Sequence, residues 1–311
     1  MNSYIIRRLL QFIPTTIAVT LIIFILLNIL PGDPAVLSGD PRRAMDVEAM
    51  KVLRDKWGLN QPVYLRYLKF LGNLVRGDLG ISFRTNRKVT DILIERIPAT
   101  LKLAVLAMLI AAIGGIFLGF ISGMKEGSIS DVTSMIGAVI GVSIPNFWLG
   151  LMLMYLFSVM LGILPSTGYG SGGDLTHIIL PSITLGVAYM ALIARVSRAA
   201  VLDVINEDYV RTARAKGLSE FIVKYKHIFR NALIPVITII GLQFGSLIAS
   251  TVVVETVFSW PGIGSLLVLS IYRRDVPVIE GCVLLIVLGF LIINLIVDIL
   301  YTYIDPRIHY Q

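Results

Sequence analysis

The chain of 311 residues has little charge and almost no cysteine. Only 15% of its residues are Asp, Glu, Lys or Arg, against about 25% in soluble domains. This low charge argues against a soluble domain. An intrinsically disordered chain is also excluded, because disordered chains are polar and poor in aliphatic residues, whereas this chain is rich in them. The single cysteine, Cys282, excludes an internal disulfide framework and a metal site built from several cysteines. It lies in an apolar run, so we expect it to face lipid or the protein core.

Hydrophobic residues are abundant instead, at 56% of the chain. The stretches without any Asp, Glu, Lys or Arg are 9–32, 103–124, 132–173, 175–194, 231–254, 256–272 and 281–297. A helix needs about 20 mostly apolar residues to cross the hydrocarbon core of a bilayer. The sequence therefore predicts an all-α integral membrane protein surrounded by membrane lipid.

Six transmembrane helices account for these stretches. We expect them at about Leu9–Leu30, Thr100–Met124, Val132–Leu164, Ser182–Ala200, Ala232–Phe258 and Gly281–Tyr303. The first follows Arg7 and Arg8 but is too long for a cleavable signal segment, so we interpret it as a retained span. The third is too long for one straight crossing, and Pro145 removes a backbone donor within it. A kink or a tilted helix is expected there.

The basic residues predict the orientation. The loop 165–181 contains no Lys or Arg, whereas 195–230 contains eight. Because cytoplasmic loops carry an excess of Lys and Arg, we expect 195–230 and both chain ends in the cytoplasm. Residues 31–99 would then lie outside. The net charge of +7 reflects this topology, and nucleic acid is not an expected partner.

The expected organisation has four parts. Residues 1–30 hold the N-terminus and the first span, and 31–99 form an extracytoplasmic segment. Residues 100–303 form the core with the other five spans and a cytoplasmic region at 201–230, and 304–311 form a cytoplasmic tail. The outer segment has apolar residues at helical spacing in Val47–Trp57 and Val63–Leu74. Gly58 ends the first of these helices and Pro62 opens the second, and we expect a small cap over the mouth of the bundle.

Small residues recur every four positions in two spans. The series is Ala111, Gly115, Gly119 and Gly123 in the second span, with Gly137 and Gly141 in the third. Small residues at this spacing let helix backbones approach closely in a membrane. The alternative is that glycine is simply common in membrane spans.

The region between the fourth and fifth spans is predicted to be a helical hairpin. In the first helix, Tyr209, Ala213 and Ala215 share a face, and Gly217 can adopt the left-handed conformation that ends a helix. Ser219 can cap the second helix, whose apolar stripe comprises Phe221, Ile222, Tyr225, Ile228 and Phe229. Periodicity leaves two interpretations open, a basic interfacial helix on anionic lipid and a docking element for a cytoplasmic partner.

The hairpin resembles the EAA signature of ABC-transporter permeases. Ala213 and Gly217 match its second Ala and its Gly, whereas Arg211 and Arg230 replace its Glu and its closing Pro. The stretch Asp208–Gly217 and the stretch Arg230–Pro235 look like the version found in dipeptide, oligopeptide and nickel permeases. Further resemblances in order along the chain are Pro31–Pro34, Gly58–Pro62, Arg76–Ser82, Ser143–Phe147, Phe258–Gly264 and Asp305–Arg307. The arrangement is most similar to the dipeptide-permease B type.

This resemblance implies a type I ABC importer permease fold in a prokaryotic inner membrane. It implies a second permease subunit, two cytoplasmic ATPase subunits and an extracytoplasmic substrate-binding protein as partners. The chain lacks a Gly-x-x-x-x-Gly-Lys-Ser/Thr motif, so it is expected to be no enzyme and to hold no cofactor, with ATP and magnesium in the ATPases. The residues expected to couple to the ATPases are Asp208, Tyr209, Arg211, Ala213, Arg214, Lys216 and Gly217.

The substrate and the translocation pathway are less well defined by the sequence. Di- or oligopeptides are the expected cargo, with nickel complexes and oligosaccharides as alternatives within the family. Asn146 and Glu255 are candidates for the pathway, because polar groups in spans tend to face the interior. An ion-coupled secondary transporter using Glu255 and Asp298 is the alternative class, but no internal repeat supports it. An intramembrane enzyme is disfavoured because His177, His227 and His309 fall in loops or chain ends.

Overall fold

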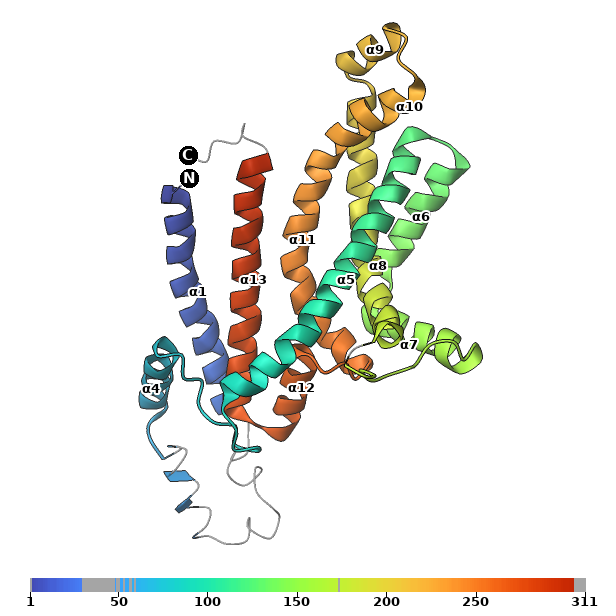
Figure 1. Cartoon of the computed structure of the whole chain (residues 1–311). Helices are drawn as coiled ribbons and strands as arrows, with labels where there is room; N and C mark the ends of the chain where they lie inside the picture. The colour runs from blue at the N-terminus through green and yellow to red at the C-terminus, as the bar shows by residue number, and fades with distance from the viewer. Residues whose placement is uncertain are drawn as a thin grey trace. The chain divides into compact units, whose positions relative to one another are not determined.

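The computed structural model describes residues 2–29, 60–172 and 174–304, and positions 48, 51, 52, 54, 55 and 58. Pro31–Pro34, most of the predicted helix Val47–Trp57 and the end of the chain from Asp305 lie outside the described residues. The side chains of Arg7 and Arg8 also lie outside them. In the described ranges the named elements are all helical (Figure 1). The chain divides into two compact units, residues 1–100 with 261–291 and residues 101–260 with 292–311.

The first unit contains both long and short helices. These are α1 (Asn2–Ile29), α4 (Val63–Val75), α12 (Ile263–Arg273), the start of α5 (Val89–Met124) and the start of α13 (Val276–Ile304). Its core joins Val89 and Leu93 to Ile263 and Cys282. Cys282 is fully buried, so it faces the protein core rather than lipid. Helix α12 begins within the Gly- and Pro-rich segment 259–264, where no helix was predicted.

The second unit contains the rest of α5 and α13 and everything between residues 101 and 260. Its elements are α6 (Ile129–Ser143), α7 (Asn146–Met154), the π-helical turn η1 (Tyr155–Met160), α8 (Leu175–Ile205), α9 (Asp208–Ala215), α10 (Glu220–Ile222), the π-helical stretch η2 (Val223–Phe229) and α11 (Arg230–Val257). Helix α8 lies at the centre and packs against α6, α7 and α11. Asp174 caps it, accepting a hydrogen bond from the backbone N–H of His177. The His177 ring and backbone hold the pKa of the Asp174 carboxyl below its usual range.

The spans agree with the prediction in number but less well in their limits. In the described residues, five helices have the length and composition of a membrane span, and a sixth results if α6 and α7–η1 form one broken span. The helices begin well before the expected apolar starts, with α5 at Val89, α8 at Leu175 and the α10–α11 run at Glu220. The predicted limits were set by the charged residues at the edges of the apolar runs. A helix can continue past such an edge when its end packs against other parts of the protein, so the helices are longer than predicted.

The third predicted span is broken at Pro145, as the proline suggested. Helices α6 and α7 meet at an angle of 103°. Ile144 and Pro145 have extended backbone, with ψ of 125° and 134°. A proline disfavours helical backbone in the residue before it and cannot donate to the preceding turn. The prediction of an interruption is therefore confirmed, and the interruption is a full break in the helix.

The glycine series of α5 brings this helix into close contact with α8. A Cβ at Gly119 would lie 2.4 Å from the Ala194 carbonyl oxygen, and one at Gly115 would lie 2.7 Å from Ile193. Gly123 meets Val201 in the same way, and Ala111 is fully buried. The close-packing prediction is confirmed for this series. It is wrong for Gly137, which has nothing within 4 Å.

We expect Gly119→Ala to destabilise the chain and Gly137→Ala to stabilise it slightly. The new Cβ at 119 meets backbone, which cannot rotate away, and overpacking of this kind costs about 1–3 kcal/mol. At 137 the same methyl group enters open space, where replacing a helical glycine by alanine stabilises a helix by about 0.5–1 kcal/mol. Thermal unfolding of the two detergent-solubilised variants measures the difference. Equal unfolding midpoints would contradict the proposed role of the glycine series.

Candidate functional site

Helix α9 presents a buried face and a charged face. Val210 is fully buried and Ala213 is 4% exposed, and α9 packs through this side against η2. Tyr209 is 41% exposed, and Ala215 is also exposed. The predicted face is wrong for exposed Ala215, and it missed Val210, which shares the buried side with Ala213, three positions apart. Asp208, Arg211, Arg214 and Lys216 are all exposed.

Gly217 ends α9 in the way the sequence predicted. Its φ is +75°, its N–H donates to the Arg214 carbonyl at 2.9 Å, and the Leu218 N–H donates to the Ala213 carbonyl at 3.3 Å. These two bonds form a Schellman motif, which needs a left-handed residue at this position. Ser219 precedes α10, but its side chain makes no capping hydrogen bond. The predicted side-chain cap is therefore absent.

The second helix of the hairpin is not a separate element. From Glu220 the chain is helical without interruption to Val257, through α10, η2 and α11. Its predicted apolar stripe is divided: Ile228 is fully buried, whereas Phe221 is 70% exposed. Phe229 packs edge-on against Phe120 of α5, with ring centroids 5.2 Å apart. We therefore correct the prediction to one short helix, α9, joined by a turn to the base of a long membrane helix.

Two ion pairs lie within the hairpin (residues 208–230). Arg214 Nε lies 3.1 Å from Glu220 Oε1, across the turn at Gly217. Arg211 and Asp208 lie 3.9 Å apart and are largely exposed, so this pair adds little stability. Partial burial, followed by the Glu207 carboxylate, raises the pKa of the Tyr209 hydroxyl. The hairpin thus offers exposed aromatic rings beside the exposed arginines Arg211 and Arg214, residue types enriched at protein interfaces.

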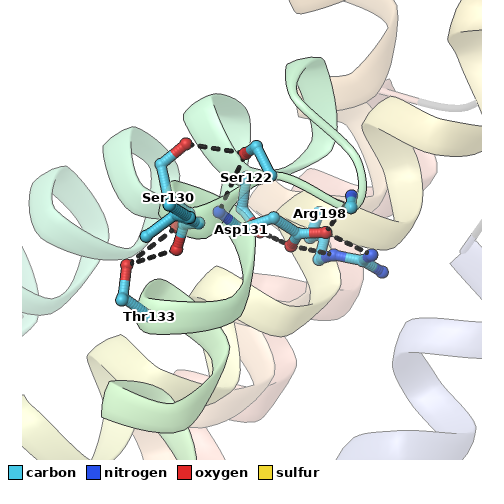
Figure 2. Close-up of polar contacts among 8 residues, drawn as sticks. Ser122, Ser130, Asp131, Thr133 and Arg198 are labelled. Carbon is cyan, nitrogen blue, oxygen red and sulfur yellow. Dashed lines mark hydrogen bonds and ion pairs between the residues drawn. The ribbon is translucent and has the colours of Figure 1, made fainter.

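A buried ion pair that the sequence did not predict anchors α8 close to this hairpin. Figure 2 shows Asp131, at the start of α6, facing Arg198 of α8. Arg198 Nε and Nη2 donate to the two Asp131 carboxylate oxygens at 2.7 and 2.9 Å. The Ser122 hydroxyl also donates to this carboxylate, and so does the Gly127 N–H, at 3.0 Å. The Asp131 side chain is 6% exposed, so every bond replaces lost hydration.

This cluster ties three helices together at the end of the second unit that carries the hairpin. Ser122 lies on α5, Asp131 on α6 and Arg198 on α8, and α8 leads directly into α9 (Figure 1). The only sequence signal for it was a pair of opposite charges next to apolar runs. Nothing in the sequence indicated that Asp131 and Arg198 meet.

The two candidate pathway residues lie on different elements. Asn146 is the half-buried first residue of α7, directly after the break. Glu255, near the end of α11, has no exposed surface, and its carbonyl accepts the Trp260 N–H at 2.8 Å. A fully buried carboxylate does not line an open passage within this chain alone. Among the described residues, no group of three His, Cys, Asp or Glu could hold a metal ion.

Sequence comparison places the whole chain among known proteins. Residues 115–310 match the family described as binding-protein-dependent transport system inner membrane component, and residues 1–104 match the corresponding N-terminal family. The chain is 46% identical over 311 residues to the glutathione transport system permease protein GsiC of Escherichia coli, covering 100% of both chains. The match to GsiC of Shigella flexneri is also 46% over the full length of both.

Structure comparison agrees on the fold. An inward-facing MetNI methionine ABC transporter structure matches with a TM-score of 0.59 at 19% identity, covering 70% of this chain and 97% of that one. An amino acid ABC transporter solved with histidines matches with a TM-score of 0.52 at 17% identity, covering 70% and 95%. At these identities the matches establish the all-helical permease fold and nothing about the cargo.

Proposed function

We propose that this chain, which belongs to the family of binding-protein-dependent transport system inner membrane components, takes part in import. The proposed cargo is short peptides of the glutathione type. The chain is a permease subunit of an ABC importer in the inner membrane. The observation that supports the cargo is the 46% identity to glutathione permeases across the full length of both chains. This identity favours a peptide over nickel complexes or oligosaccharides.

The partners follow from this function. A second permease completes the translocation pathway, two ATPases bind on the cytoplasmic side, and an extracytoplasmic binding protein delivers the peptide. ATP and magnesium belong to the ATPases, and this chain has no catalytic residue. Both chain ends are placed in the cytoplasm, on the side of the eight Lys and Arg residues of 195–230.

The hairpin is the proposed ATPase contact. Asp208, Tyr209, Arg211, Arg214 and Lys216 present exposed polar and aromatic surface. Ala213 and Gly217 act differently: buried Ala213 lets α9 lie close to η2, and Gly217 sets the turn. The hairpin (residues 208–230) continues without a break into α11, so a push on it moves a complete membrane helix.

ATP biases the transport cycle only through differential binding. When the ATPases close around ATP, the state of the permease that fits the closed ATPases is stabilised, and the spans reorient. Movement of α9 reaches α8 through the short connection 206–207 and reaches α11 through the turn at Gly217. Asn146, at the break, and Glu255, once reorientation of the spans exposes it near the end of α11, are the proposed polar groups along the pathway.

A co-purification experiment tests this proposal. The tagged chain is extracted in mild detergent from its own cells, and mass spectrometry identifies what accompanies it. We expect a second permease and two ATPases. The reconstituted complex, supplied with its binding protein and ATP, should take up labelled glutathione in preference to nickel chelates and oligosaccharides. A folded chain that repeatedly purifies alone, with uptake driven by an ion gradient, would contradict the proposal.

A further inference from the structure

Helix α4 of the 31–99 segment is joined to the side of α1 by polar contacts. The Tyr67 hydroxyl donates to the Ile17 carbonyl at 3.0 Å and lies 3.2 Å from the Thr20 hydroxyl. Arg66 Nη1 donates to Asn28 Oδ1 at 2.9 Å. The Tyr67 ring packs on Phe24, with centroids 5.2 Å apart. These contacts run along α1 from residue 17 to residue 28.

The positions of these contacts on α1 give their depth in the membrane. The apolar part of α1 is Leu10–Ile29, one of the candidate membrane spans. At 1.5 Å per residue, Thr20 lies about 14 Å from the end at Ile29. Half of the hydrocarbon core is about 15 Å. The Tyr67 hydroxyl therefore reaches the middle of the span, while Asn28, the partner of Arg66, lies at its end.

Most of the remaining α4 surface is apolar, and its exposed Lys69 has a side chain long enough to reach the headgroup region. None of its residues is buried, and Tyr64, Leu65 and Leu68 are 66%, 44% and 60% exposed. Other exposed side chains of α1, such as Ile22 and Ile25, are apolar as well. A Tyr hydroxyl in hydrocarbon needs a hydrogen-bond partner, and Ile17 and Thr20 provide one. Arg66 meets Asn28 at the membrane boundary, where a long basic side chain can reach water.

We propose that α4 is embedded in the leaflet that holds the C-terminal half of α1, with Tyr64, Leu65 and Leu68 against lipid acyl chains. With the orientation given above, this is the outer leaflet. The 31–99 segment then contains a membrane-inserted helix as well as external loops, in contrast to the external cap expected from the sequence. The inference concerns α1 and α4 alone, so it stands or falls independently of the cargo and the ATPases.

Site-directed spin labelling tests the environment of α4. Single cysteines replace Leu65 or Leu68 in the complete transporter, reconstituted into phosphatidylethanolamine–phosphatidylglycerol vesicles. Ile22→Cys on α1 is the lipid control, and Gln61→Cys, exposed just before α4, is the water control. The unmodified chain measures background from Cys282, which is fully buried. Collisions with molecular oxygen and with a neutral nickel chelate report lipid and water, respectively.

The three environments give three different results. If α4 contacts lipid, the rate of collision with oxygen at residues 65 and 68 should be high and equal to that at Ile22. The rate of collision with the chelate should be about tenfold lower than at Gln61, because a polar solute is excluded from hydrocarbon. High collision with the chelate would place α4 in water and overturn the proposal. Low collision with both probes would show that protein, such as the second permease, covers this face, and would also overturn it.

Discussion

Gly217→Val is expected to uncouple transport from ATP hydrolysis while the chain remains in the membrane. Gly217 has a φ of +75°, a conformation that costs a residue with a side chain about 1–2 kcal/mol and is an outlier for a β-branched one. Valine would break the Schellman motif that joins Leu218 to Ala213 and so misplace α9 relative to η2. Since each 1.4 kcal/mol is tenfold, we expect uptake to fall about tenfold or more.

The measurement is peptide uptake per ATP hydrolysed in proteoliposomes. Uptake should fall more than ATP hydrolysis, because the ATPases themselves are unchanged. Gly217→Asn should retain most uptake, since asparagine tolerates the left-handed region. Gly162→Val, at a φ of +64° in a different loop with nothing within 4 Å, is the strain control and should keep its coupling ratio. Unchanged uptake with Gly217→Val would remove the argument that the hairpin is the ATPase contact.

Local signals in the sequence predicted what depends on neighbouring residues. The break at Pro145, the left-handed Gly217 and the helix α4 follow from residues within a few positions, and the structure agrees with each. The close approach of α5 and α8 was predictable because Gly115, Gly119 and Gly123 repeat with the helical period. In each case the physical cause, a missing donor or a missing side chain, is visible in the residue itself.

Features that depend on distant residues were not predictable. The second helix of the hairpin continues into α11 because Val223 and Ile228 are buried by other helices, and the sequence does not state what covers them. Gly137 has the same spacing as Gly141 but faces open space. Helix α12 follows a turn rich in glycine and proline, and its burial against Val89 and Leu93 of α5 makes it stable there. Contacts with residues distant in the sequence determine all three of these features.

The buried pair Asp131–Arg198 is the most consequential of these distant contacts. Removing one member of a buried ion pair leaves an uncompensated charge and costs about 3–5 kcal/mol. The Arg198 side chain is 27% exposed, so we expect Arg198→Met to cost about 3 kcal/mol, the lower end of that range. Arg195→Met, an exposed arginine on the same helix, is the matched control and should change stability by about 0.5 kcal/mol or less.

A double-mutant cycle separates the ion pair from simple loss of packing. In Asp131→Asn with Arg198→Met no charge remains buried, and the asparagine can still accept from Gly127 and bond to Ser122, the two other partners of Asp131. We therefore expect the double variant to unfold at a higher temperature than Arg198→Met alone, although it carries one more substitution. Additive losses would mean that the carboxylate tolerates the absence of Arg198 and that the cluster does not hold α5, α6 and α8 together. A favourable coupling energy would instead show that the ion pair holds α8 to the α5–α6 turn. Because the hairpin follows α8 directly, the pair would then also fix the position of the hairpin.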